Sequence, residues 1–288
     1  MTETGKAHAK INLSLDIVSK RDDGYHNLKS VMQTVNLFDE IMLECVPGEG
    51  VCVDAGRPYL PSDQRNIAAK AALAFFDHTG IKGYYSHIKI NKNIPVCAGL
   101  GGGSADGACV LRLLDKMFKT EFGYKTLETI GISIGSDVPF NIEGGTKLVE
   151  GRGERLTALP PVPFCYIVIC KPSFSCSTPE LFGRIKCEKI HARPDTDGLV
   201  KALYDNNLGG VARRMYNVFE DALPRGRQDI SDIKNALLDN NAQGAVMTGS
   251  GPSVFGLFEN KEDASNAYKQ LKENYSECFL TETINNQV

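Results

Sequence analysis

Apolar and polar residues alternate near the N-terminus, with apolar side chains at Ile11, Leu13, Leu15 and Ile17. Alternation with a period of two is typical of a half-buried β-strand. It places Lys10, Asn12 and Ser14 together on the face opposite the core. The pattern returns at residues 86–91, and apolar runs predict two further strands, at 31–37 and 40–46.

Elsewhere the apolar positions recur every three or four residues, which is typical of helices that bury one face. Helices are predicted at 66–77, from the glycine-rich stretch to about Phe118, and at 126–134, 198–204, 217–222, 228–239 and 261–273. Short apolar runs predict strands at 165–170, 245–247 and 254–258. Because strands and helices alternate, the predicted class mixes α and β structure. Two adjacent glycines and a later proline-rich run place a domain boundary between about 145 and 163, and we divide the chain into 1–155 and 156–288.

A glycine-rich stretch at residues 95–107 reads PVCAGLGGGSADG and leads into one of these helices. Such a loop lets several backbone N–H groups point at one anion, where the helix dipole adds positive charge. Ser104 and Asp106 are residue types that cap a helix start. A Walker loop is excluded because no Gly-Lys-Ser/Thr follows, and a dinucleotide fingerprint lacks its third glycine. The pattern favours a phosphate site, with an ordinary tight turn as the alternative.

Composition narrows the class of partner. The chain has 288 residues, a net charge of −3 and no run of about 18 apolar residues, so neither nucleic acid nor a membrane is an expected partner. Nine cysteines without a C-x-x-C pair argue against a disulfide framework or a zinc site. Reduced thiols and the lack of a charged-then-apolar leader predict a cytoplasmic protein.

Several motifs together resemble one superfamily. Residues 95–106 resemble the phosphate loop of the GHMP kinases, and residues 247–253, MTGSGPS, resemble their third motif. KINL at 10–13 and DGYHNL at 23–28 resemble, within that superfamily, the family of 4-diphosphocytidyl-2-C-methyl-D-erythritol kinases. GSDVPF at 135–140 and GRGE at 151–154 also match, and the motifs follow the family's order.

The resemblance implies an α+β fold of two domains, namely an S5-like nucleotide-binding domain and a ferredoxin-like substrate domain with the site between them. It implies a kinase that uses ATP with Mg²⁺ to phosphorylate the 2-hydroxyl of the cytidyl substrate, in the non-mevalonate route to isoprenoid precursors. We expect a monomer or a weak homodimer. The alternatives are another GHMP kinase, of the homoserine or mevalonate type, and a non-catalytic protein that keeps the fold and binds ligand.

The resemblance also implies roles for single residues. Asp137 is the predicted base, with a helix or turn cap as the alternative, and it shares substrate binding. Lys10 is its predicted partner, although a solvated lysine at a strand edge is the commoner case. Asn12 is predicted to bind the erythritol hydroxyls. Tyr25 would stack on the cytosine and His26 would read its edge. The remaining predicted substrate contacts are Thr178, Phe182, Gly249 and Ser250, where Phe182 could instead be plain core.

For ATP, the resemblance implies that Asn66 and Lys92 contact the adenine. The predicted phosphate contacts are Pro95, Gly99, Leu100, Gly101, Gly102, Gly103, Ser104, Ala105 and Asp106. Ser104 and Asp106 would lie beside the magnesium ion, whose ligands the sequence does not identify. Gly107 stands where the family usually has alanine. Compared with alanine, glycine weakens a helix start by up to about 1 kcal/mol.

Overall fold

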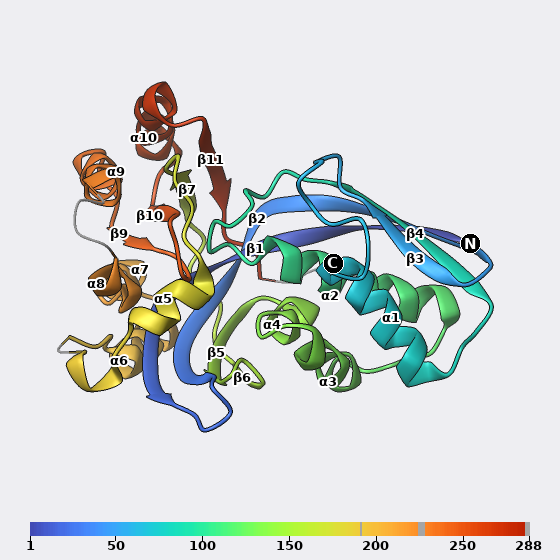
Figure 1. Ribbon diagram of the computed structural model, residues 1–288. Coiled ribbons are helices and arrows are strands. Elements are labelled where there is room, and N and C mark those ends of the chain that lie inside the picture. The colour runs from blue at the N-terminus through green and yellow to red at the C-terminus, as the bar shows by residue number, and fades with distance from the viewer. Residues whose placement is uncertain (191, 224–227, 286–288) are drawn as a thin grey trace.

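The computed structural model describes residues 1–190, 192–223 and 228–285. Its larger sheet has the strand order β3-β4-β2-β1-β8 (Figure 1). The strand β5 also pairs with β2, and β6 pairs with β5. Its strands are β1 (Thr2–Lys20), β2 (His26–Pro47), β3 (Gly50–Asp54), β4 (Tyr84–Asn91), β5 (Thr146–Gly151), β6 (Arg155–Ala158) and β8 (Tyr216–Asn217). Most neighbours are antiparallel, while β3–β4 and β1–β8 are parallel.

Two long strands, β1 and β2, form the centre of this sheet and pair antiparallel with three shifts in register. The prediction of separate strands at 31–37 and 40–46 was wrong, because both lie within β2. A polar residue, Asp39, interrupts the apolar pattern there, yet its side chain is fully buried. A buried carboxylate requires partners inside the protein, and those partners belong to the site described below.

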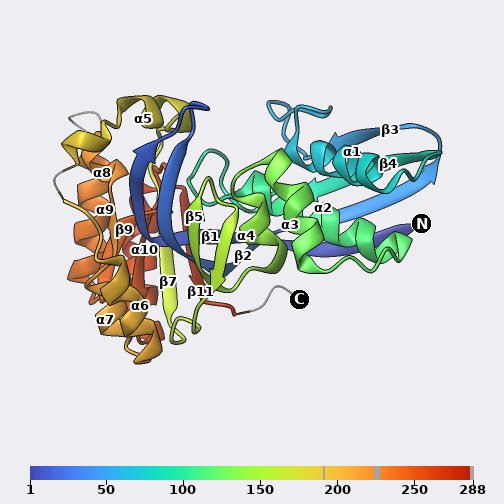
Figure 2. The same cartoon turned by 90° about the horizontal axis from the view of Figure 1, so that it is seen from below.

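One face of the larger sheet is covered by four helices (Figures 1 and 2). They are α1 (Ile67–Thr79), α2 (Gly102–Phe118), α3 (Tyr124–Ile134) and α4 (Val138–Glu143). The side chain of Asn66 caps α1 by accepting the Ala68 N–H. Gly107 lets α1 and α2 approach closely, because a Cβ there would lie 2.8 Å from Cγ2 of Ile67.

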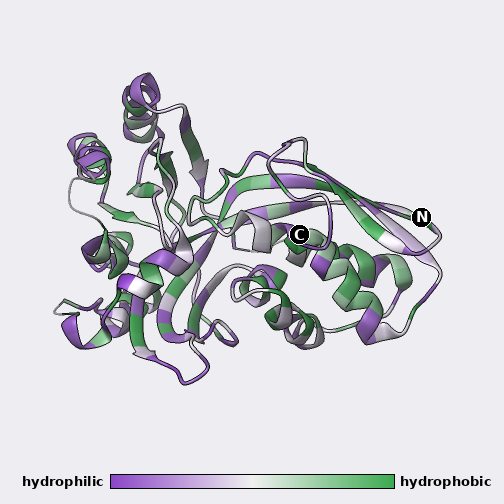
Figure 3. Cartoon of the chain, in the orientation of Figure 1, coloured by the Kyte–Doolittle hydropathy of each residue, from purple (hydrophilic) through white to green (hydrophobic). Residues whose placement is uncertain are grey.

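The smaller sheet has the order β11-β7-β10-β9 and is antiparallel throughout its described length. Its strands are β7 (Tyr166–Lys171), β9 (Gly244–Met247), β10 (Val254–Phe258) and β11 (Glu277–Glu282). The accompanying helices are α5 (Thr178–Arg184), α6 (Thr196–Tyr204), α7 (Leu208–Ala212), α8 (Phe219–Ala222), α9 (Gln228–Asp239) and α10 (Lys261–Asn274), with a 3₁₀ turn η1 (Cys187–Lys189). Hydrophobic and hydrophilic residues mix along α9 and α10 (Figure 3), and the apolar face of α9 buries Ile233 and Leu237.

The predicted helices are confirmed within a few residues, except at 217–222, where β8 precedes a helix of four residues. The strands β3, β5, β6 and β11 were not predicted, and β6 begins at Arg155. The division of the chain into two domains at residue 155 stays a prediction. In the described part of the chain, no helix has both the length and the apolar character that crossing a membrane requires.

Candidate active site

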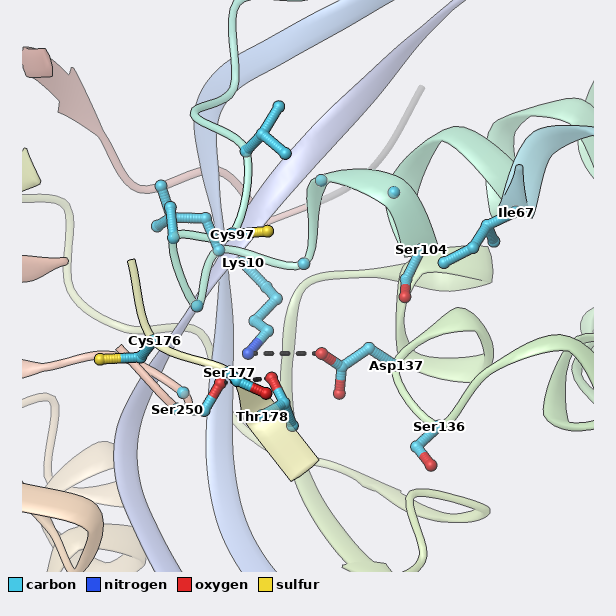
Figure 4. A pocket seen from close by; sticks show the side chains of 18 of the residues that line it. Lys10, Ile67, Cys97, Ser104, Ser136, Asp137, Cys176, Ser177, Thr178 and Ser250 are labelled. Atoms are coloured by element: carbon cyan, nitrogen blue, oxygen red, sulfur yellow. Dashed lines mark hydrogen bonds and ion pairs between the residues drawn. The ribbon is translucent and has the colours of Figure 1, made fainter. Parts of the chain in front are cut away.

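A pocket of about 1070 Å³ opens where β1, the glycine-rich stretch, α5 and the turn after β9 meet (Figure 4). All the residues predicted to bind or react line this pocket except Ala105, which is buried in α2. Segments as distant in sequence as Lys10, Asp137 and Ser250 therefore face one cavity. The concave shape and the gathering of polar groups are typical of a small-molecule site.

Lys10 and Asp137 form an ion pair inside the pocket, with 3.4 Å between Nζ and Oδ2. The lysine side chain is 4% exposed, so the alternative of a solvated strand-edge lysine is excluded. Asp137 directly precedes α4, but its side chain makes no capping hydrogen bond. Its carboxylate points instead toward Lys10 (Figure 4). The pair therefore joins a buried cation to a carboxylate that is still open to a ligand.

Asn12 holds Lys10 in place. Its Oδ1 accepts a 2.7 Å hydrogen bond from the Lys10 ammonium, and its Nδ2 donates to the Ser30 hydroxyl at 2.8 Å. Its backbone N–H donates to Oγ1 of Thr248, within the third motif. With these partners the Asn12 side chain is oriented by the protein itself. Its predicted contact with substrate hydroxyls stays a prediction, and the structure adds a positioning role.

The glycine-rich stretch turns sharply before α2. Gly99 and Gly101 have φ of +76° and +69°, a conformation that favours glycine. Gly102 and Gly103 already belong to the first turn of α2, and Gly101 is its N-cap. The prediction that Ser104 or Asp106 caps the helix was therefore wrong, because both lie inside it. A glycine cap has no side chain to occupy the first N–H groups, which remain available to an anion.

The third motif packs directly on this turn. A Cβ added to Gly99 would lie 2.2 Å from the carbonyl oxygen of Thr248, and one added to Gly249 would lie 2.6 Å from the carbonyl oxygen of Gly99. The two segments thus meet backbone to backbone. A side chain at either glycine would force them apart, so this contact fixes the phosphate loop against the second sheet.

Three ionisable side chains form a buried cluster at the base of the glycine-rich stretch. Lys92 donates to Asp39 and, at 2.8 Å, to Oδ2 of Asp106. Asp39 also accepts the backbone N–H groups of Asn93 and Ile94. The cluster therefore links the residues just before the loop to the first turns of α2. Lys92 is 6% exposed at its side chain, and its predicted contact with adenine stays a prediction.

The ionisation of this cluster follows from its burial. Burial raises the pKa of Asp106 to about 8, and the nearby Lys92 ammonium only partly opposes that rise. Burial alone would lower the pKa of Lys92, but the two carboxylates raise it above its usual value. The Oδ1 atom of Asp106 is buried without a hydrogen-bond partner among the described residues. Sequence reasoning missed Asp39, whose only signal was a lone carboxylate inside an apolar run.

The far end of the pocket is aromatic. The rings of His26 and Phe182 lie 5.2 Å apart, and Phe182 also packs edge-on against Phe219 at 4.9 Å. The exposed ring of Tyr25 is covered on one face by the Arg152 guanidinium, 3.8 Å from the ring centroid. Burial, with a smaller effect of Lys20, lowers the pKa of His26, so its imidazole is neutral at pH 7. A neutral imidazole can both donate and accept a hydrogen bond.

Thr178 and Ser250 close the pocket from the side of the second sheet. Their hydroxyl oxygens lie 2.7 Å apart, which links the start of α5 to the turn after β9 (Figure 4). Within the described residues, no three His, Cys, Asp or Glu side chains lie close enough together to hold a metal ion.

Comparison with known proteins agrees with this geometry. The family model described as the GHMP kinases N terminal domain matches residues 66–145, and the GHMP kinases C terminal model matches 199–277. A 4-diphosphocytidyl-2-C-methyl-D-erythritol kinase of Clostridium botulinum (strain Loch Maree / Type A3) is 45% identical over 97% of this chain and 99% of its own. The chain belongs to this kinase family. An Acetivibrio thermocellus kinase with the same description is 46% identical over 97% of this chain and 98% of its own.

Solved structures agree with the family assignment. The crystal structure of a 4-(cytidine 5'-diphospho)-2C-methyl-D-erythritol kinase superposes with a TM-score of 0.79 at 27% identity, covering 98% of this chain and 99% of the other. A homoserine kinase from Cytophaga hutchinsonii, 21% identical, shares the fold with a TM-score of 0.77 over 99% and 95% of the two chains. The predicted α+β GHMP kinase fold is thereby confirmed, as is an ATP-dependent small-molecule kinase.

Proposed function

We propose that this kinase transfers the γ-phosphoryl group of ATP to the 2-hydroxyl of 4-diphosphocytidyl-2-C-methyl-D-erythritol, a step in non-mevalonate isoprenoid precursor biosynthesis. The observation that carries the proposal is the Lys10–Asp137 pair, which lies in one pocket with the phosphate loop and an aromatic end. The aromatic end supports a cytidyl substrate, because a planar base can stack on Tyr25. Homoserine and mevalonate have no base for that end to bind.

In the proposed reaction the ATP phosphates lie at the N-terminus of α2, against free backbone N–H groups and the positive end of the helix dipole. The substrate 2-hydroxyl lies at Asp137, whose carboxylate takes the proton as the oxygen attacks the γ-phosphorus. The new O–P bond forms, the bond to the β–γ bridging oxygen breaks, and ADP leaves. Lys10 stabilises the charge that develops on the attacking oxygen, and Asn12 keeps its ammonium in place.

The residues present fit a magnesium ion carried in with ATP. The unpartnered Oδ1 of Asp106 is one available oxygen, and the Ser104 hydroxyl lines the same pocket. Mg²⁺ usually takes only one or two protein ligands besides phosphates and water, which agrees with the small number offered here. The ion would neutralise charge on the phosphates. We also propose a cytoplasmic monomer or weak homodimer with no nucleic-acid or membrane partner.

An ADP-release assay tests the proposal with the diphosphocytidyl substrate, homoserine and mevalonate as separate acceptors. We expect turnover with the cytidyl compound alone, abolished by omitting Mg²⁺ and restored by adding it. Turnover with homoserine or mevalonate at comparable kcat/KM would assign the chain to another kind of GHMP kinase. ATP and substrate binding without turnover would instead support the non-catalytic alternative.

A further inference from the structure

The described cations that line the pocket differ in whether they have a partner. Lys10 is paired with Asp137, and Lys92 lies between Asp39 and Asp106. Arg65, at the outer edge, is bonded to Asp63 at 2.9 and 3.1 Å. The guanidinium of Arg152 has no hydrogen bond or ion pair with any described residue, and its Nε is buried without an acceptor. A buried donor without an acceptor is costly, typically by about 1–3 kcal/mol.

The position of Arg152 is fixed by the turn between β5 and β6. Gly151 and Gly153 flank it with φ of +71° and +121°, and Glu154 accepts the Arg152 backbone N–H at 2.6 Å. A Cβ on Gly153 would lie 2.2 Å from the carbonyl oxygen of Ser136, so the turn touches the segment that carries Asp137. From this turn the Arg152 side chain reaches the ring of Tyr25. Arg152 thus connects the reacting end of the pocket to its aromatic end.

Asp23 is the carboxylate whose pKa the charge of Arg152 affects, but it forms no ion pair with Arg152. Desolvation alone would raise the pKa of Asp23, but hydrogen bonds from the Tyr25 N–H and from Arg21 lower it, and the charge of Arg152 is a smaller cause of the lowering. Asp23 is bonded to Nε of Arg21 at 3.0 and 3.2 Å, and no ion pair joins it to Arg152. His26 is neutral, as its lowered pKa implies. Among the described cations that line the pocket, the Arg152 guanidinium is therefore the one without a carboxylate partner.

We propose that Arg152 binds the diphosphate group of the cytidyl substrate. This assignment rests on the function proposed above. In that substrate the diphosphate lies between the cytidine and the methylerythritol, just as Arg152 connects Tyr25 to the segment of Asp137. A guanidinium presents a planar fork of N–H donors that matches two oxygens of a phosphate. Arg152 is a binding residue for the anionic middle of the substrate, and its guanidinium also covers one face of the Tyr25 ring.

The test separates phosphate recognition from base recognition. Dissociation constants of cytidine and of CDP are measured by calorimetry, with the ATP site filled by a non-hydrolysable ATP analogue. The wild type is expected to bind CDP at least 10-fold more tightly than cytidine. Arg152→Met keeps the length of the stem and removes the charge. It is expected to weaken CDP binding by about 10- to 100-fold, the range for charge-assisted hydrogen bonds, and cytidine binding by less than about 3-fold.

Two further variants control the result. Arg152→Lys keeps the charge without the planar fork, and its CDP affinity is expected to lie between those of wild type and Arg152→Met. Arg155→Met removes an exposed arginine from the same hairpin, outside the pocket lining, and should bind both ligands like wild type. An unchanged CDP-to-cytidine ratio in Arg152→Met, or equal weakening of both ligands, overturns the assignment. If wild type binds neither ligand while ATP still binds, the cytidyl function fails as well.

Discussion

Replacing Gly99 with alanine is expected to reduce stability and turnover together. The new Cβ would lie 2.2 Å from the Thr248 carbonyl oxygen and 3.0 Å from the Gly251 nitrogen. These two atoms are themselves hydrogen-bonded at 2.9 Å, so the obstacle is a tight turn rather than a flexible side chain. The phosphate loop and the third motif must therefore separate by about 1 Å to reach ordinary contact, an overpacking of the kind that typically costs about 1–3 kcal/mol.

The backbone adds a second cost, because the φ of +76° at Gly99 is unfavourable for alanine by about 1–2 kcal/mol. Together these effects predict a loss of about 2–5 kcal/mol in the free energy of unfolding. Thr248 also accepts the Asn12 N–H, and Asn12 holds the Lys10 ammonium. A shift of about 1 Å at the reacting groups can cost about 10²-fold in rate, so kcat/KM should fall by about that factor.

Gly80→Ala is the matched control. Gly80 has a φ of +68° at the end of α1, but a Cβ there would meet no atom within 4 Å. It should lose only the backbone contribution of about 1–2 kcal/mol and keep wild-type kcat/KM. Urea unfolding followed by far-UV circular dichroism gives the stabilities, and ADP release gives the rates. The reasoning is refuted if Gly99→Ala matches Gly80→Ala in both measurements.

Three further sets of variants probe the reacting groups, the aromatic end and a buried histidine. Asp137→Asn should lower kcat by about 10²- to 10⁴-fold with little change in substrate KM, and near-normal turnover would remove this residue as the base. Tyr25→Ala and Phe182→Ala should each raise KM for the cytidyl substrate about ten-fold or more and leave KM for ATP unchanged. His26→Ala should lower the preference for cytidyl over uridyl analogues, and an intact preference would contradict base reading by that side chain. Burial lowers the pKa of His8 to about 4. Between pH 6.5 and pH 4 the histidine is therefore protonated in the unfolded chain but not in the folded one, and the free energy of unfolding decreases as the pH is lowered. Over that pH range, urea titrations should show a smaller decrease in the free energy of unfolding for His8→Gln than for wild type, by up to about 3 kcal/mol. Equal decreases would exclude His8 as the cause.

Local patterns were enough to predict most of the helices and the glycine turn that precedes α2. The cap of α1 at Asn66 and the run from the glycine-rich stretch to Phe118 follow from interactions within a few residues. The start of α2 was predicted less well, because Ser104 and Asp106 looked like caps. The structure begins the helix at Gly102, and the left-handed glycines are Gly99 and Gly101. A run of glycines shows that another backbone segment can approach closely, but it does not show which glycine makes that contact.

The site depends on contacts that no local pattern encodes. Asp39 interrupts an apolar run, and its partner Lys92 is more than 50 residues away in the sequence. That pairing exists only because β2 and β4 are neighbours in the sheet. Tyr25 and Phe182 were predicted to contact the substrate, but the sequence did not show that Phe182 packs on His26 or that Arg152 lies over Tyr25. Which side chains become neighbours is determined by tertiary packing.

The sequence by itself determined the family and pointed to Lys10 and Asp137 as the predicted reacting pair, because motifs record the chemical groups that a reaction requires. Lys10, Asp137 and the glycine-rich stretch are recognisable without coordinates. The tertiary structure alone decided which charges are already neutralised. Burial leaves Lys10 and Lys92 with carboxylate partners and leaves Arg152 without one. The physical reason is that a charge removed from water needs a nearby counter-charge, and only the fold determines which groups are near.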